Sequence, residues 1–435
     1  MAATLQRLDL RTIAGDVRPH LPRPELAGEG PIAAVRAILA EVRDHGDGAL
    51  RRLTAQFDGA AIDTLRMPPA DLAAALEAIP PALRHALEAA RDAILEYHRT
   101  QAAPAPEPHR RDGVTIRDLT RPVDRAGVYI PGGRAPLHST VLMTAVPARV
   151  AGVKEVVLCT PPSKDGTVAA ATLAAAALAG VDEVYRVGGA QAIAAMAYGT
   201  ETIRPVDVIV GPGNVYVSLA KHEVAQAGLV GVPSGFAGPS EVVVIADDET
   251  PVEMAAIDVI VQAEHGPDGL AWLVTWSEKA ADRITDAVTD LTKRAARRDD
   301  IESTLAKGGY CVLVSGPEQA LEVANAVAPE HLELMSADPE SLVPLIRNAG
   351  AVFCGPYSPA ALGDYLASPS HVLPTYGTAR FASGLQVDDF LKRIHVIEAG
   401  PPAIAKLAPF ITAIAESEGL SAHADSIRLR TPEGR

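Results

Sequence analysis

The fold is decided by residues 154–188, "KEVVLCTPPSKDGTVAAATLAAAALAGVDEVYRVG". Two short β-branched runs, "KEVVLCT" and "DEVYRVG", flank the alanine-rich run 167–181. The alanine-rich run is too short and too weakly hydrophobic to span a bilayer. We therefore interpret it as a buried helix that crosses between two parallel strands.

The same alternation continues on both sides of this stretch. Short β-branched runs recur between helical patterns from about residue 126 onward: "GVYI" (127–130), "VDVIVG" (206–211), "EVVVIAD" (241–247), "LAWLVTW" (270–276), "YCVLVSG" (310–316) and "AVFCG" (351–355). Alternating strands and helices predict parallel sheets covered by helices on both faces. There are enough strands for two such units, roughly 126–240 and 241–370, whereas residues 31–99 and 386–435 have helical patterns.

The composition limits the class of protein. A chain of 435 residues is too long for one core, so we expect at least two domains. The net charge of −15 and the lack of a Lys/Arg block argue against a nucleic-acid partner and favour an enzyme for a neutral or cationic small molecule. The three cysteines lie far apart and the first residues have no apolar signal-peptide core, so we expect a cytoplasmic protein with reduced cysteines and no membrane contact.

Three glycine-rich turns follow predicted strands, at 132–133, 188–189 and 211–214. Each could cradle a pyrophosphate with backbone N–H groups, or could simply make a tight turn between a strand and a helix. None carries the full dinucleotide fingerprint, so a dinucleotide would have to bind atypically. A further glycine pair, Gly28 and Gly30, follows no strand, and we interpret it as a helix start with Pro31 at the first helical position.

The segment "VQAEHGPDG" (261–269) places polar side chains at the end of an apolar helix. A capping-box pattern at 250–253 and a stop at 266–267 predict a helix over about 251–265. Gln262 and His265 are three residues apart and share a face, so they could converge on one cation near the negative helix C-terminus. Alternatively, they only satisfy the last carbonyls of the helix.

A second polar cluster lies in "VAPEHLELM" (327–335). Pro329 disfavours helix at Ala328, so Glu330 and His331 begin a new element. Adjacent side chains point in different directions and could act on one substrate carbon as an acid/base pair. The alternative is the first turn of an ordinary helix, with an acidic residue at its positive end.

Two further stretches contain candidate residues. The irregular segment 361–393 holds Asp364 and His371, and so long an irregular segment is often functional. Near the C-terminus, "SEGLSAHADS" contains Glu418 and His423, although a single histidine in a tail is usually solvated.

Nine motifs occur in order along the chain: "VYIPGG", "STVLM", "GGAQAIAAMAYGTETI", "GPGNVYV", "AGPSEV", "QAEHGPDG", "APEHLEL", "GDYLASPSHVLPTYGTARFASGL" and "VDDFLKR". Together they closely resemble histidinol dehydrogenase, and the resemblance covers essentially residues 30–430. Two places differ from the usual family pattern, His138 in "HST" and the segment 233–236 before Ser240.

The resemblance implies that L-histidinol is oxidised through histidinal to L-histidine, the last step of histidine biosynthesis, with reduction of two NAD⁺. It implies one Zn²⁺ per subunit, held by Gln262, His265, Asp364 and His423. Glu330 and His331 would be the catalytic acid/base pair. Substrate would contact Ser240, His371, Glu418, His331 and the four zinc ligands, and NAD would contact Tyr129, Gln191 and Asn214.

The resemblance also implies an α/β fold with two Rossmann-like, doubly wound parallel-sheet domains and helical N- and C-terminal extensions. The expected parts are an N-terminal arm (1–25), a metal and catalytic domain (26–127 plus 241–385), an NAD-binding domain (128–240) and a helical tail for dimerisation (386–435). A homodimer is implied in which the tails are exchanged, since a lone pair of tail helices cannot bury its apolar face.

Three other functions compete with this interpretation. A relative with the same fold could oxidise a different primary alcohol. A zinc hydrolase is possible in principle, because a glutamate and a metal can activate water for amide cleavage. A non-catalytic binding protein fits least well, because both Glu330 and His331 are present.

Overall fold

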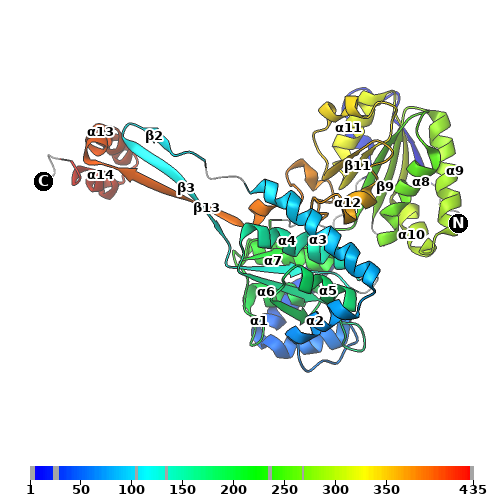
Figure 1. The fold of residues 1–435 in the computed structure, drawn as a ribbon. Helices are drawn as coiled ribbons and strands as arrows, with labels where there is room; N and C mark the ends of the chain where they lie inside the picture. Colours follow the sequence, from blue (N-terminus) through cyan, green and yellow to red (C-terminus); the bar gives the residue numbers. More distant parts are fainter. Residues whose placement is uncertain are drawn as a thin grey trace. The chain divides into compact units, whose positions relative to one another are not determined.

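The computed structural model describes residues 5–22, 29–102, 106–132, 136–233, 238–266 and 269–431. The chain forms two compact units (Figure 1). The first unit consists of residues 1–101 and 124–390, and the second of residues 102–123 and 391–435. Among the described residues, no helix is both long and apolar enough to cross a membrane.

The first unit contains a four-stranded parallel sheet in the order β6-β5-β4-β7. Its strands are β4 (Arg125–Tyr129), β5 (Glu155–Thr160), β6 (Glu183–Arg186) and β7 (Val208–Val210). The helices that follow them are α4 (His138–Ala151), α5 (Ala170–Leu178), α6 (Gly189–Tyr198) and α7 (Val215–Gln226). The predicted crossover of residues 154–188 is confirmed as β5-α5-β6, and His138 is the first residue of α4.

The second sheet of the first unit has six parallel strands in the order β1-β10-β9-β8-β11-β12. The strands are β1 (Gln6–Asp9), β8 (Glu241–Ala246), β9 (Leu270–Thr275), β10 (Gly309–Leu313), β11 (His331–Leu334) and β12 (Ala351–Cys354). The long helices between them are α8 (Val252–Val261), α9 (Glu278–Arg294), α10 (Arg298–Gly308) and α11 (Pro317–Val327). The N-terminal arm therefore supplies an edge strand.

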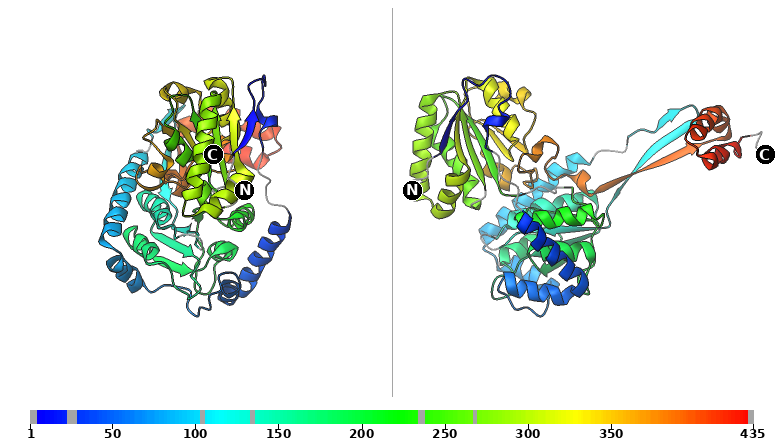
Figure 2. Two further views of the ribbon diagram at one scale, coloured as in Figure 1. Left: turned by 90° about the vertical axis from the view of Figure 1, so that its right-hand side faces the viewer. Right: turned by 180° about the vertical axis from the view of Figure 1, so that it is seen from behind.

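Both faces of the six-stranded sheet are buried, as the continuous apolar strand "EVVVIA" requires. Val242 and Val244 pack with α8, α9 and α10 in one core, whereas Val243 and Ile245 pack with α11 in another. Alternate residues of a strand point to opposite faces, so an unbroken apolar run needs helices on both sides (Figure 2). The predicted α/β class with two doubly wound parallel sheets is confirmed.

The N-terminal helices pack differently from the prediction. α1 (Glu29–Phe57), α2 (Pro69–Ala78) and α3 (Pro81–Gln101) contact the helices of the four-stranded sheet, and Leu50 of α1 shares a core with Ile193 of α6. The grouping of residues 26–127 with 241–385 is therefore wrong for these helices. An amphipathic pattern shows that a helix has a buried face, but not which sheet covers it.

The start of the predicted N-terminal helix also changes. α1 includes Glu29, so Pro31 is its third residue rather than its first. Gly28 lies outside the described residues, as do Gly133, Pro267 and residues 234–237.

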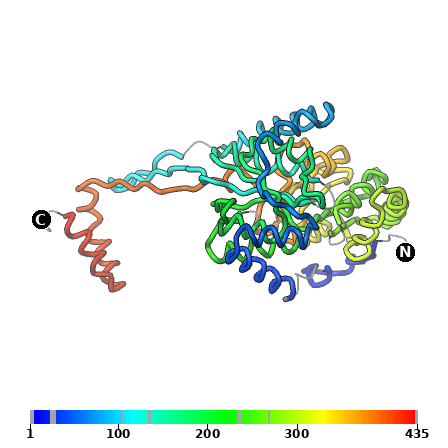
Figure 3. The backbone as a smooth tube through the Cα atoms, turned by 90° about the horizontal axis from the view of Figure 1, so that it is seen from below, coloured from blue at the N-terminus to red at the C-terminus, as the bar shows by residue number. Residues whose placement is uncertain are grey.

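The second unit is built on a three-stranded antiparallel sheet. β3 (Val114–Pro122) pairs along its whole length with β13 (Leu391–Ala399), and β2 (His109–Arg111) extends the other side of β3. The paired strands β3 and β13 run side by side next to the helices α13 (Pro401–Ser417) and α14 (Ser421–Arg428) (Figure 3). The segment 386–435 was predicted to be helical, but β13 forms its first part because it has a strand partner far away in the sequence.

The remaining short helices lie mostly in the irregular regions. They are α12 (Ala360–Tyr365), η1 (Arg18–His20), η2 (Ala263–His265), η3 (Glu340–Leu345), η4 (Thr378–Arg380) and η5 (Val387–Phe390).

Candidate active site

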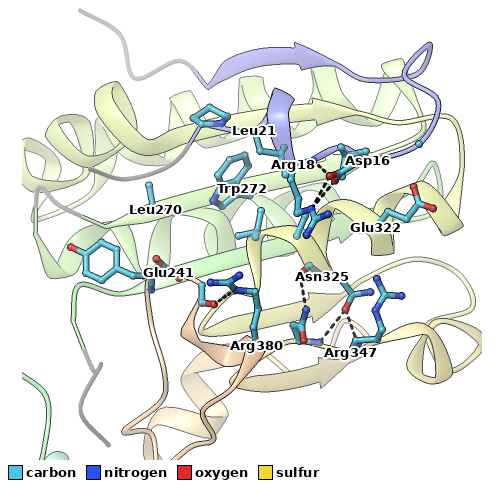
Figure 4. Close-up of a pocket in the computed structure, with 18 residues that line it drawn as sticks. Asp16, Arg18, Leu21, Glu241, Leu270, Trp272, Glu322, Asn325, Arg347 and Arg380 are labelled. Carbon is cyan, nitrogen blue, oxygen red and sulfur yellow. Dashed lines mark hydrogen bonds and ion pairs between the residues drawn. The ribbon is translucent and has the colours of Figure 1, made fainter. Parts of the chain in front are cut away.

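Several of the predicted site residues gather around one cavity in the first unit. This cavity has a volume of about 350 Å³ and is lined by His331, Asp364 and His371. A larger cavity of about 730 Å³ is lined by none of the predicted site residues (Figure 4). Cavity size therefore does not select the predicted residues, and we place the candidate site by the chemistry of its side chains.

The catalytic pair lies at the start of a central strand. Ala328 ends α11 in the left-handed conformation with a φ of 52°, and β11 begins three residues later at His331. The predicted break before Glu330 is confirmed. The alternative, the first turn of a helix, is wrong because β11 finds partners on both sides, β8 and β12.

His331 is buried and held by two contacts. Its ring stacks on Phe353 with centroids 5.8 Å apart, and its Nδ1 lies 3.1 Å from the main-chain oxygen of Glu241. A carbonyl can only accept, so Nδ1 carries the proton and Nε2 is left toward the cavity. Among the described residues Nε2 has no hydrogen-bond partner, and it lies 3.5 Å from Asp364 Oδ1.

The charges around His331 favour its protonated form. Burial disfavours the imidazolium, but Glu330 and Asp364 outweigh burial and raise the pKa of His331 well above its ordinary value. A base must be neutral to accept a proton. A cation beside these carboxylates would lower the pKa of His331 and favour the neutral ring.

Glu241 was not singled out by the sequence analysis, yet it contacts both members of the predicted acid/base pair. Its main-chain N–H donates to Glu330 Oε2 at 2.9 Å, while its carbonyl accepts from His331. Burial, followed by the negative charge of Glu330, raises the pKa of the Glu241 carboxyl to about 8. Its position after Ser240 in "AGPSEV" was the available signal, but only the pairing of β8 with β11 brings it to the catalytic pair.

The predicted zinc ligands of the first unit lie together. Gln262 caps the C-terminus of α8, is buried, and donates from Nε2 to Asp364 Oδ2 at 3.3 Å. His265 ends η2 with an exposed side chain. Burial opposes ionisation of Asp364, but His331, His371 and His265 together lower the pKa of its carboxyl.

The predicted capping box of this helix is wrong. No side chain caps the N-terminus of α8, because the Thr250 hydroxyl instead donates to the carbonyl of Met335 at 2.8 Å. The predicted helix over 251–265 is also shorter than expected, since α8 ends at Val261 and one turn of 3-10 helix follows. This turn places Gln262 and His265 at the end of two successive helical segments.

In the described part of the chain, no three His, Cys, Asp or Glu side chains gather closely enough to hold a metal ion. The predicted set of four ligands takes Gln262, His265 and Asp364 from the first unit and His423 from the second. The other two predicted residues, Glu418 and His423, belong to the second unit, where both side chains are exposed.

His371 and Ser240 flank this cluster. His371 uses both ring nitrogens, since Nδ1 lies 2.9 Å from the Asp364 carbonyl and Nε2 lies 3.0 Å from Thr140 Oγ1. Burial lowers the pKa of His371, which favours its neutral form. His371 thus holds Asp364 in place. Ser240 is half-buried directly before β8.

The three predicted NAD residues lie at the carboxyl ends of strands in the four-stranded sheet. Tyr129 ends β4, and its buried hydroxyl accepts from Gly189 N at 3.0 Å. Gln191 is buried in the first turn of α6 after β6. Asn214 caps α7 after β7, where its Oδ1 accepts two backbone N–H groups at 3.1 Å.

The same edge has the features of a dinucleotide crevice. The strand order reverses between β4 and β7, and in open parallel sheets ligands bind at such a reversal. Gly211 has a φ of 108°, and a Cβ at this position would lie 2.1 Å from the Tyr129 carbonyl oxygen, so only glycine fits the turn.

Comparison with known proteins gives one consistent family. The family model described as "Histidinol dehydrogenase" matches residues 21–431. Histidinol dehydrogenase of Moorella thermoacetica is 47% identical over 407 residues, which cover 93% of this chain and 95% of the relative. That of Parasynechococcus marenigrum is 47% identical over 431 residues, 98% of this chain and 95% of the relative.

A solved structure agrees. The crystal structure of histidinol dehydrogenase from Elizabethkingia anophelis matches with a TM-score of 0.91 and 34% identity, covering 98% of both chains. A full-length family match, close relatives and a shared fold lead to one conclusion: this chain belongs to the histidinol dehydrogenase family.

Proposed function

We propose that this protein oxidises L-histidinol through histidinal to L-histidine, with reduction of two NAD⁺, as the last step of histidine biosynthesis. The observation that carries the proposal is the grouping of Glu330 and His331 with Asp364 and Gln262. In this arrangement His331 Nε2 faces a carboxylate 3.5 Å away at a 350 Å³ cavity. Family membership supports the choice of substrate.

The donor set fits a zinc ion. One amide, one carboxylate and two imidazoles are available in Gln262, Asp364, His265 and, from the tail, His423. The side chains of Gln262 and His265 lie at helix C-terminal ends, whose partial negative charge favours a cation. When bound, zinc would hold the amine and imidazole nitrogens of histidinol, and so would orient the substrate more than activate its alcohol.

The two catalytic side chains divide the proton transfers. His331 Nε2 takes the hydroxyl proton as a hydride leaves the substrate carbon for NAD⁺. This requires a neutral ring, and a cation beside Asp364 would lower the pKa of His331 toward that state. Glu330 takes a proton from the water that adds to histidinal, and the hydrate then gives a second hydride.

NAD would bind at the carboxyl edge of the four-stranded sheet. Tyr129, Gln191 and Asn214 lie at the ends of three of its strands, and the N-terminus of α7 adds partial positive charge for a pyrophosphate. Gly211 keeps this turn close to the end of β4.

The tail would complete the site of a second subunit. Glu418 and His423 are exposed on the second unit, whereas the other proposed zinc ligands belong to the first. A homodimer with exchanged tails supplies His423 in trans.

The deciding experiment measures NADH formed per L-histidinol consumed, with L-histidine quantified in parallel. The proposal expects a ratio of two. A ratio of one would leave an alcohol dehydrogenase that stops at the aldehyde. Turnover of other primary alcohols but not histidinol would support the related dehydrogenase, and amide cleavage without NADH would support the hydrolase.

Tail exchange has its own test, a mixture of His331→Ala and His423→Ala chains refolded together. In a mixed dimer one of the two sites regains a complete set of residues. Activity should reach up to about a quarter of wild type for random pairing, although neither variant is active alone. A mixed dimer that forms but stays inactive would show that His423 serves its own chain.

A further inference from the structure

Glu241 contacts the proposed catalytic pair with its main chain, while its side chain lies on one face of the six-stranded sheet. It is the first residue of β8, and its main chain points along the sheet toward the start of β11. Its side chain lies with that of Val243 on the α11 face, where it forms part of the wall of the 730 Å³ cavity near Leu270 and Trp272 (Figure 4). One residue therefore contacts the catalytic pair and the opposite side of the sheet.

The main chain of Glu241 orients both proposed catalytic groups. The N–H donates to Glu330 Oε2 at 2.9 Å, and the carbonyl accepts from His331 Nδ1 at 3.1 Å. The first contact sets the direction of the carboxylate. The second fixes the tautomer of the imidazole and the aim of Nε2. A shift of this single peptide segment would misplace both groups together.

The side chain of Glu241 fixes that peptide segment. Its Oε1 accepts from Tyr376 N at 3.0 Å, and nearby Gly238 N donates to Thr375 Oγ1 at 2.8 Å. These two hydrogen bonds attach the start of β8 to the segment before η4. The Glu241 side chain is only 2% exposed, so water cannot easily replace the contact.

We infer that Glu241 is a positioning residue for the catalytic pair: its carboxyl anchors the start of β8 to residues 375–376 and so holds the groups that orient Glu330 and His331. The inference rests on the proposed roles of Glu330 and His331. Glu241 makes its hydrogen bonds to Glu330, His331 and Tyr376, not to the proposed zinc or NAD ligands, so its loss should affect turnover more than binding.

Burial and the negative charge of Glu330 favour a neutral Glu241 side chain, whereas His331 and the arginines that line the cavity favour the ionised form. Glu330 and His331 face it from β11, and Arg18, Glu322, Arg347 and Arg380 line the same cavity from other elements. A second negative charge beside Glu330 would repel it. A glutamine has the same shape, stays neutral, and can still accept from Tyr376 N.

The test compares Glu241→Ala with Glu241→Gln in the zinc-loaded full chain. Glu241→Ala should lower kcat about 10- to 100-fold, as expected when catalytic groups are misplaced. The KM for histidinol, the KM for NAD⁺ and the zinc content should stay within about twofold of wild type. Glu241→Gln should keep kcat within about threefold. These limits follow from keeping or losing one anchoring hydrogen bond.

Gln319→Ala is the matched control. Gln319 is also a buried polar residue, in α11, and its side chain makes three hydrogen bonds, with Ser315, Leu10 and Ile13. Its loss should lower the melting temperature without lowering kcat. A wild-type kcat in Glu241→Ala, or an equal loss in Glu241→Ala and Glu241→Gln, would overturn the inference.

Two further variants keep the outcome clear. If Glu241→Ala does not fold, Glu241→Asp, which keeps the acid but shortens its reach, should lower kcat while Glu241→Gln does not; the reverse order would overturn the inference. Glu330→Gln and His331→Asn are measured beside them. If neither slows NADH formation, the proposed function loses its catalytic pair, whereas normal turnover in Glu241→Ala alone removes only the positioning role.

Discussion

The two sheets of the first unit are wound alike but place their candidate sites at opposite edges. In the four-stranded sheet, Tyr129, Gln191 and Asn214 follow the carboxyl ends of strands. In the six-stranded sheet, Glu241 and His331 are the first residues of their strands. The usual rule places ligands at the carboxyl edge, and the six-stranded sheet departs from it.

The helices explain the difference. Helices begin at the carboxyl edge of a parallel sheet, so this edge presents N–H groups and partial positive charge that suit a pyrophosphate. Helices end at the amino edge, where carbonyls and partial negative charge suit a cation. Asn214 starts α7, where partial positive charge suits the pyrophosphate of NAD. Gln262 ends α8, where partial negative charge suits a metal cation.

The largest effect on turnover is expected from a substitution at the amino edge of the six-stranded sheet. His265→Ala should abolish zinc binding and turnover, because it removes one of only four proposed ligands. The melting temperature of the metal-free protein should change little, since the side chain is exposed. Zinc content measured by atomic absorption should also fall below roughly pH 6 in wild type, because ligand imidazoles must be neutral. Glu264→Ala, on the same turn, is the control; full zinc and normal turnover in His265→Ala would reject the assignment.

The catalytic pair should give the next largest effect. His331→Asn should slow histidinol oxidation, and Glu330→Gln should mainly slow conversion of supplied histidinal. Losses of about 10²–10⁴ are expected for general acid/base groups. Single-turnover assays with each substrate separate the two steps. The division of roles fails if Glu330→Gln oxidises histidinal at the wild-type rate.

A substitution at the carboxyl edge of the four-stranded sheet should have a weaker effect, and the effect should appear in the KM for NAD⁺. Asn214→Ser keeps a helix cap but loses the amide, so the KM for NAD⁺ should rise about three- to tenfold with zinc content unchanged. Asn214→Ala should show the same rise and also lose about 0.5–2 kcal/mol of stability because the cap is gone. If only the stability of Asn214→Ala changes, Asn214 is a cap and nothing more, and the NAD site must lie elsewhere.

The smallest effect on turnover should come from Lys221, a fully buried residue of α7 whose ammonium donates to the Gly211 carbonyl. Burial lowers the pKa of Lys221 from 10.5 to about 7. Between these values the unfolded chain holds a proton that the native state has released, so wild type should gain stability as pH rises from about 7 to about 10. Lys221→Met should lack this gain.

The stability contributed by Glu241 should change with pH in the opposite direction. Its carboxyl has a pKa raised from 4.5 to about 8, so the native state keeps a proton that the unfolded chain releases. Wild type should therefore lose stability relative to Glu241→Gln between about pH 4.5 and 8. For either residue the slope can reach about 1.4 kcal/mol per pH unit. Urea unfolding at several pH values measures both, and curves parallel to wild type would contradict the assigned protonation states.

The sequence by itself determined the features that depend on neighbours along the chain. The period of apolar residues indicated the alternation of strands and helices that forms both parallel sheets. Pro329 marked the break before Glu330, and Gly266 follows the end of η2. The long motifs, not the spacing of single polar residues, identified the family and hence the candidate site.

Tertiary structure decided which elements meet. Leu50 of α1 packs with Ile193 of α6, beside the four-stranded sheet, and β13 pairs with β3. The local sequence of α1 or β13 does not indicate which element it contacts. The contact of Glu241 with Glu330 joins residues 89 positions apart. Hydrophobic pattern and propensity act over a few residues, whereas such contacts depend on strand order, and that order is fixed only when the whole core packs.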